Sequence, residues 1–305
     1  MQSRSSIDLV VTILARLWVI LLSTAFAQAQ AKSSVSFNFT SFDYPEAIAT
    51  QALGISQNGV IVGYYLDASA AEHGFIRLPK GTFEMVDYPS AVGTILFDIN
   101  DSKEAVGLYN GSDTFYQGFL FEPPDQFTLI YYSPLASATD PYGINNSGQV
   151  VGAWSEDQVQ GGFSLLDGTY TELLYPSAVF TYPYGVNSSG IIGGSWVSVC
   201  NPICQYHGFT LTSAADGTYT DVDFPGAVMT FLYAINDSNQ LVGSYVDAAG
   251  VDHGWIGVRS KNQYTTVDYP GGSGTVVHGI NNTRHIVGWY SDTNNVVHGF
   301  LAVPE

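Results

Sequence analysis

The stretch HGINNTRHIVGWY at residues 278–290 repeats, with substitutions, the stretch YGINNSGQVVGAW at residues 142–154. The shared core is Gly-Ile-Asn, a turn, then Val-Gly, one residue and an aromatic side chain. Six copies are present: GISQNGVIVGYY (54–65), DINDSKEAVGLY (98–109), GINNSGQVVGAW (143–154), GVNSSGIIGGSW (185–196), AINDSNQLVGSY (234–245) and GINNTRHIVGWY (279–290). A motif that returns every 42 to 49 residues indicates one supersecondary unit used six times.

Each unit contains four short β segments, which we call a to d. Segment a ends in the Gly-Ile-Asn core, b carries the Val-Gly-x-aromatic motif, c reads His-Gly-aromatic or a variant of it, and d runs into an aromatic-Pro corner, as in GTFEMVDYP. The a–b connections, such as NNSG and NDSN, consist of residues that favour tight hairpin turns. Repeated four-stranded antiparallel units of this length predict an all-β fold, a β-propeller with six blades.

The two ends of the chain predict how the ring closes. The last unit stops after its c segment, VVHGFLAVPE, whereas SVSFNFTSFDYP at residues 34–45 matches a d segment and precedes the first a segment. Pairing of the two would leave no open sheet edge. We therefore expect a single propeller over residues 34–305; an open solenoid is the alternative. The expected units are residues 46–89, 90–134, 135–176, 177–225, 226–270 and 271–305, the last completed by 34–45.

The repeats resemble the bacterial extracellular HAF repeats, which have a G-x-N-x-x-G-x-V-V-G core followed by His-Ala-Phe. The resemblance covers residues 42–305. This sequence has His-Gly-Phe instead, and Gln117 and Gly161 replace the histidine in two units. The resemblance implies export and a repeat architecture, and no chemistry.

The first 31 residues are predicted to be a signal peptide. Arg4 and Arg16 precede an apolar run, Leu17 to Ala27, that ends in the small-x-small sequence Ala25-Phe26-Ala27. The run is shorter than the roughly 20 residues that span a bilayer, so an uncleaved anchor is the less favoured alternative. After cleavage we expect a secreted or periplasmic protein without a membrane span.

The composition limits the possible partners. The formal charge is −18, and it becomes about −19 when the leader with Arg4, Arg16 and Asp8 is removed. Such an acidic surface repels nucleic acids and anionic lipids. Cys200 and Cys204 lie in one loop, VSVCNPICQYHG, and in an oxidising compartment they predict a local disulfide; a redox or metal role is the alternative.

Comparison of the six copies separates scaffold positions from candidate site positions. Features that return in every copy are expected to serve the blade: the b-segment aromatics, the threonines of segment a and the glycines. The histidines at 73, 207, 253 and 298 are equivalent by rotation and would lie far apart, so we expect structural histidines and no metal site. Positions that vary between copies are the better candidates for function.

Two variable columns of segment a are expected to line the central channel. Three residues before the core glycine the column contains Asp140 and Tyr182; one residue before, it contains Tyr142, Tyr184, Tyr233 and His278. Regular alternation would put both columns on one side of the strand. We predict that these six residues form a ligand site near the channel mouth, beside the long and variable b–c loops. Aromatic faces with a few polar groups suit a carbohydrate or another neutral polar ligand, although packing between blades is the simpler interpretation.

Three functions follow from these patterns. The favoured one is a non-enzymatic binding module for an extracellular ligand, such as a polysaccharide or cell-surface component, because no nucleophile, metal, phosphate-binding or cofactor motif is found. The alternative is a polysaccharide hydrolase or lyase, which needs paired carboxylates and would use Asp140. A metal site in the loops with Asp67, Asp247, Asp252 and Asp292 is the third, but no spacing there gathers six oxygens.

Overall fold

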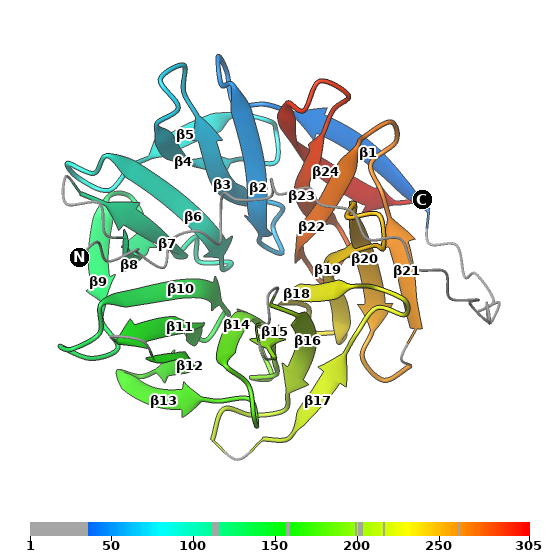
Figure 1. The fold of residues 1–305 in the computed structure, drawn as a ribbon. Coiled ribbons are helices and arrows are strands. Elements are labelled where there is room, and N and C mark those ends of the chain that lie inside the picture. Colours follow the sequence, from blue (N-terminus) through cyan, green and yellow to red (C-terminus); the bar gives the residue numbers. More distant parts are fainter. Residues whose placement is uncertain are drawn as a thin grey trace, which may run out of the picture. The chain divides into compact units, whose positions relative to one another are not determined.

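The computed structural model describes residues 36–111, 116–156, 159–198, 200, 204–215, 217–261 and 263–305. The predicted leader and its cleavage site lie outside the described residues. The described chain contains 24 strands and no helix, so it contains no helix long and apolar enough to cross a membrane. The strands form six four-stranded antiparallel sheets arranged in a ring, which confirms the six-bladed β-propeller (Figure 1).

The first five sheets each use four consecutive strands, and the sixth takes its outer strand from the start of the chain. The sheets are β2 (Ala49–Ile55), β3 (Ile61–Leu66), β4 (Glu72–Arg77) and β5 (Phe83–Val86); β6 (Gly93–Ile99), β7 (Ala105–Asn110), β8 (Tyr116–Glu122) and β9 (Gln126–Ile130); β10 (Ala138–Ile144), β11 (Val150–Glu156), β12 (Val159–Leu166) and β13 (Thr169–Leu173); β14 (Phe180–Val186), β15 (Ile192–Val197), β16 (Tyr206–Leu211) and β17 (Tyr219–Val222); β18 (Met229–Ile235), β19 (Gln240–Val246), β20 (Asp252–Val258) and β21 (Gln263–Val267); and β22 (Gly274–Ile280), β23 (Ile286–Ser291), β24 (Val297–Pro304) and β1 (Phe37–Phe42).

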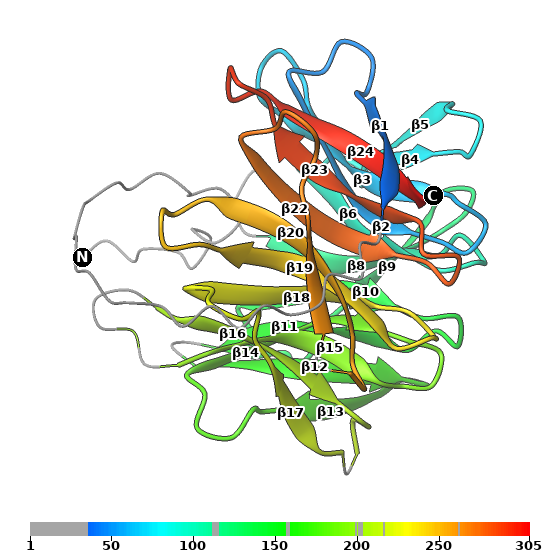
Figure 2. The same ribbon diagram turned by 90° about the vertical axis from the view of Figure 1, so that its right-hand side faces the viewer.

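The ring closes by pairing of the first and last strands. β1 runs antiparallel to β24 from Phe37 opposite Pro304 to Phe42 opposite Gly299, and the two strands lie side by side in both views (Figures 1 and 2). The ring of Phe39 contacts the rings of Tyr269 and Phe300, with centroids 5.4 and 5.5 Å apart. The orphan segment at the amino end therefore completes the last sheet, as its sequence predicted.

A threonine and an aromatic stack attach each corner to the sheet that follows. The aromatic residue of each corner donates its backbone N–H to the threonine Oγ1 in the next inner strand, at 2.9 to 3.1 Å in all six copies. Its ring also stacks on the aromatic residue of the second strand, with centroids 3.6 to 4.7 Å apart and planes within 8°. The repeated aromatics are thus packing residues.

The repeated histidines bind the aspartates that precede the aromatic-Pro corners. The pairs, with Nδ1 to carboxylate distances of 2.7 to 3.0 Å, are His73 with Asp87, His207 with Asp223, His253 with Asp268, and His298 with Asp43. Asp67, which the metal hypothesis invoked, instead accepts the backbone N–H groups of Ser69 and Ala71 at 2.8 and 2.9 Å. It therefore closes its own loop, and the described residues contain no group of three metal-ligating side chains.

The disulfide predicted from the sequence is also present. Cys200 and Cys204 form a disulfide with an S–S distance of 2.04 Å. The bond spans four positions of a b–c loop, so it shapes that loop and adds little to the stability of the ring.

Closure of the ring predicts that one aromatic side chain of β1 is important for stability. Replacement Phe39→Ala should lower the free energy of unfolding by about 2–3 kcal/mol, because it removes the contacts with the last sheet. Asn38→Ala, at an exposed position of the same strand, should change it by less than about 0.5 kcal/mol. Urea denaturation measures both, and equal effects would contradict closure through this strand.

Candidate functional site

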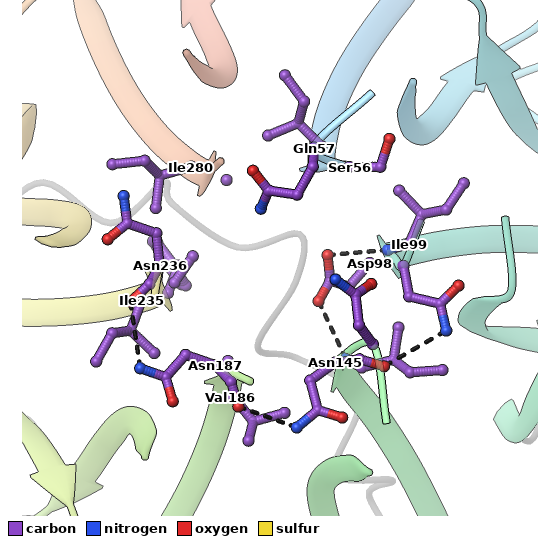
Figure 3. A pocket seen from close by; sticks show the side chains of 18 of the residues that line it. Ser56, Gln57, Asp98, Ile99, Asn145, Val186, Asn187, Ile235, Asn236 and Ile280 are labelled. Carbon is purple, nitrogen blue, oxygen red and sulfur yellow. Dashed lines mark hydrogen bonds between the residues drawn. The ribbon is translucent and has the colours of Figure 1, made fainter. Parts of the chain in front are cut away.

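A cavity of about 70 Å³ opens where the six inner strands turn into the second strands (Figure 3). Residues from β2, β6, β10, β14, β18 and β22, and from the turns after them, line it. The sequence placed the ligand site beside the variable b–c loops. The cavity lies instead at the opposite end of the inner strands, because antiparallel strands put the a–b turns and the b–c loops at opposite ends.

The asparagine of the Gly-Ile-Asn core closes each turn around this cavity. In five sheets its Oδ1 accepts the backbone N–H groups two and four residues later, at 2.9 to 3.1 Å; the residues are Asn100, Asn145, Asn187, Asn236 and Asn281. These side chains are buried, 5% exposed or less. In the first sheet Ser56 takes this position, and its Oγ accepts only the N–H of Val60, at 3.2 Å.

The same asparagines join neighbouring sheets. Each Nδ2 donates to the backbone carbonyl of the equivalent residue in the next sheet, at 2.9 to 3.4 Å, and the last of them, Asn281, donates to the carbonyl of Ser56. Five such bonds encircle the cavity, and Figure 3 draws those from Asn145 and Asn187. The serine of the first sheet has no amide to make the sixth. We call this set the amide ring.

A second, more exposed set of hydrogen bonds lies at the mouth of the cavity. It involves the residue after each ring position: Gln57, Asp101, Asn146, Ser188, Asp237 and Asn282. Asp101 and Asp237 each accept hydrogen bonds from both neighbouring sheets. Asp101, for example, accepts bonds from Gln57 N and Asn146 Nδ2, each at 2.8 Å. The mouth is therefore polar, and its charged members are both carboxylates.

An aromatic belt forms the floor of the cavity. Its rings follow one another around the axis, with centroids 4.4 to 5.3 Å apart, in the order Phe97, Tyr142, Tyr184, Tyr233 and His278. His278 Nδ1 closes the circle by a 3.0 Å bond to the carbonyl of Leu53. Each belt residue sits at a β-bulge, since the pairing of every inner strand skips that position. A bulge re-aims its side chain, here toward the cavity.

Four of the six predicted site residues line the cavity, and two do not. Tyr142, Tyr184, Tyr233 and His278 are belt residues. Asp140 and Tyr182 lie two positions earlier on their strands and contact the belt from behind: Tyr142 donates its hydroxyl to Asp140 Oδ2 at 3.4 Å, and the rings of Tyr182 and Tyr184 are 6.2 Å apart. Regular alternation of side chains along the strand predicted that both columns of segment a would line the channel. Because of the bulges, only the column that contains Tyr142 and Tyr184 lines the cavity.

Burial changes the protonation of the site. Desolvation raises the pKa of Asp140 to about 7, although the bond from Tyr142 lowers it, and none of the described residues binds its Oδ1. Desolvation also lowers the pKa of His278 to about 4, so this imidazole is neutral at pH 7. The belt tyrosines are likewise protonated, because desolvation raises the pKa of each.

Asp98 is a cavity residue that the sequence analysis missed. It lines the wall, and its carboxylate accepts the N–H of Ile99 at 2.9 Å and that of Ile144 in the next sheet at 3.0 Å (Figure 3). Desolvation raises its pKa to about 7, although these two bonds lower it. The signal was in the repeats, because the other five copies have glycine or alanine at this position. A side chain there meets the neighbouring sheet: a Cβ at Gly143 would be 2.4 Å from the carbonyl oxygen of Tyr184.

Comparison with known proteins supports the fold and identifies no family. The chain matches no protein-family model and no curated protein, so the HAF resemblance remains a prediction. The putative TolB from Agrobacterium tumefaciens is similar with a TM-score of 0.57 and 16% identity, covering 87% of this chain and 93% of that one. TolB from Acinetobacter baumannii has a TM-score of 0.55 and 11% identity over 79% of this chain, which spans only 63% of that protein.

A carbohydrate-binding protein is also among the similar structures. The Aleuria aurantia lectin, solved in complex with Fucα1-6GlcNAc, has a TM-score of 0.51 and 9% identity, covering 85% of this chain and 97% of that one. At such identities these likenesses establish the class of the protein, a β-propeller, and not its ligand.

The amide ring predicts that Ser56→Asn stabilises the protein. An asparagine there can donate the missing bond to the carbonyl of Asn100, which should add about 1 kcal/mol to the free energy of unfolding. Ser102→Asn, in the exposed part of the next turn, is the matched control and should change it by less than about 0.5 kcal/mol. Chemical denaturation distinguishes the two. No gain from Ser56→Asn would mean that the inter-sheet amide bonds contribute no net stability.

The raised pKa of Asp98 predicts that ionisation of this carboxyl lowers the free energy of unfolding in a pH-dependent way. Folding raises the pKa of Asp98 to about 7 from the ordinary aspartate value of 3.8, so ionisation of Asp98 destabilises the fold progressively as the pH rises from about 4 to 7. Asp98→Asn removes this penalty. The stability of the variant relative to the parent should therefore increase over that range, by at most about 4 kcal/mol because the carboxyl faces an open channel.

Urea denaturation at a series of pH values measures the effect of Asp98→Asn. Asp125→Asn, at an exposed turn, is the control and should give a difference that does not change with pH. A constant difference for Asp98→Asn as well would show that this carboxyl is not buried as described.

Proposed function

We propose that this chain is an exported binding protein, not an enzyme, and that it holds a polar terminal group of its ligand in the channel cavity. The observation that carries the proposal is the construction of the cavity. Every sheet contributes a belt or wall position, and hydrogen bonds between sheets fix the wall before any ligand arrives. A wall that is fixed in advance loses little entropy when a ligand binds.

The size of the cavity limits what enters it. Pockets that enclose drug-sized ligands have volumes of about 300–1,000 Å³. The cavity of about 70 Å³ is much smaller, so it receives a terminal group while the rest of the ligand passes over the polar mouth. This arrangement suits the end of a polymer or of a surface-attached chain.

Carbohydrate is the ligand class that we propose to test first. Aromatic rings with polar groups around them match the mixed polar and apolar faces of a sugar, and a sugar-binding propeller is similar in fold. Export is supported by the disulfide between Cys200 and Cys204, because such bonds persist in oxidising compartments.

The polysaccharide hydrolase or lyase remains the alternative, because the pKa values of Asp98 and Asp140 are both raised to about 7. Their surroundings favour binding over catalysis. Both oxygens of Asp98 already accept backbone N–H groups, and Asp140 does not line the cavity. The cavity lining therefore lacks two free carboxylates that face each other across a substrate.

A glycan-binding screen tests the proposed function. We expect binding without turnover, and a loss of at least tenfold in affinity for Tyr184→Ala, which removes one ring of the belt. Tyr131→Ala, on an exposed tyrosine outside the cavity, is the control and should bind normally. Thermal denaturation checks that both variants are folded.

Two outcomes would contradict this proposal. Binding that is unchanged in folded Tyr184→Ala protein would remove the cavity as the ligand site. Turnover of a polysaccharide that is abolished by Asp140→Asn would favour the enzyme instead.

A further inference from the structure

The amide ring uses most of its own hydrogen-bond donors to hold the sheets and turns together. In Asn100, Asn145 and Asn236 one Nδ2 hydrogen goes to the next sheet and the other to a side chain of the same turn, namely Glu104, Gln149 or Gln240. The hydroxyl of Tyr142 donates to Asp140. What these groups leave for a ligand is acceptor capacity, because a carbonyl or carboxylate oxygen has more than one lone pair.

The charges of the cavity have one sign. Its lining includes three carboxylates, Asp98 in the wall and Asp101 and Asp237 at the mouth, and no lysine or arginine. His278 is the remaining titratable group besides the tyrosines, and desolvation keeps it neutral. Lys103 and Arg284 lie in the surrounding turns but do not line the cavity.

Asp98 can still accept hydrogen bonds from a ligand. Its two backbone donors use one site on each oxygen, and a carboxylate offers about four sites in all. The other two carboxylates, Asp101 and Asp237, each accept bonds from both neighbouring sheets, so Asp98 is the carboxylate best placed to bind a group that enters the cavity (Figure 3).

The aromatic belt adds a second attraction of the same kind. Phe97, Tyr142, Tyr184 and Tyr233 surround the axis at the floor. Aromatic rings attract cations through the negative charge of their faces. A belt of rings below a partly buried carboxylate is an arrangement that favours an organic cation.

We propose that the cavity binds a primary ammonium group, held by Asp98 and the aromatic belt, with three N–H donors facing a wall that offers acceptors. This inference rests on the proposed function, in that it takes the cavity to be the ligand site, and it names the group that enters. An ammonium group fits the small volume. Its source is either an amino sugar with a free amine or the side chain of a lysine.

Matched pairs of probes test the inference and separate these sources. The first pair is a glucosamine pentamer and the N-acetylglucosamine pentamer, and the second is Nα-acetyl-lysine amide and Nα,Nε-diacetyl-lysine amide, which differ only in the ε-amine. Calorimetric titration at pH 7 and low salt should show the amine binding at least tenfold more tightly than its acetylated partner within at least one pair. The pair that responds identifies the source.

The outcomes distinguish this inference from the proposed function. Equal binding of the two members within both pairs would overturn the ammonium site while leaving the cavity as a ligand site. Absence of binding by all four probes would overturn the ammonium site too, and the glycan screen with Tyr184→Ala would then decide the proposed function separately.

Variants test the role of the carboxylate. Asp98→Asn should weaken binding of the responding amine at least tenfold and leave its acetylated partner unchanged, because only the charge is lost. Asp125→Asn is the charge-matched control outside the cavity and should have no effect. If Asp98→Asn fails to fold, Asp237→Asn at the mouth should still weaken amine binding at least twofold. Unchanged amine binding in a folded Asp98→Asn protein would refute the proposal.

Discussion

Each sheet of this protein packs only against its two neighbours, so the ring is complete only if the last sheet meets the first. Pairing of β1 with β24 supplies that contact, since Phe39 packs on the sixth sheet while the chain continues directly into the first. Residues from the two ends of the chain thereby become neighbours, as in the bond between Asp43 and His298. Closure fixes the diameter of the channel, and with it the distances among all the side chains that point inward.

The amide ring also depends on closure of the ring of sheets. A side chain as short as asparagine reaches the next sheet only because the inner strands converge there, and the bonds that result consume most of the amide donors around the cavity. Scaffold and site are therefore not independent. The hydrogen bonds that hold the sheets together leave a wall of acceptors, and they explain why the cavity is polar and negative although its floor is aromatic.

The sequence predicted the scaffold well because the scaffold is repeated. Six copies identified the threonines of segment a, the aromatics of segment b and the histidines as structural, and all of them have equivalent contacts in the structure. Of the predicted ligand residues, the structure places only some at the cavity. Tyr142, Tyr184, Tyr233 and His278 line the cavity, but Asp140 and Tyr182 lie behind them, because a bulge at each belt position changes the direction of the side chain and bulges have no clear sequence signature here. Asp98 was overlooked, although it alone departs from glycine or alanine in its column.

What the sequence determined by itself is the local unit and its number: alternating apolar segments, turn residues and corners specify four strands, and six copies with complementary ends specify a closed ring. What only the tertiary structure decided is which end of the channel is hollow, which polar groups are still free to bind and which carboxyls have a raised pKa. Those properties depend on the distance between inner strands of different sheets. A repeat unit cannot encode that distance on its own, because ring closure sets it for all six sheets together.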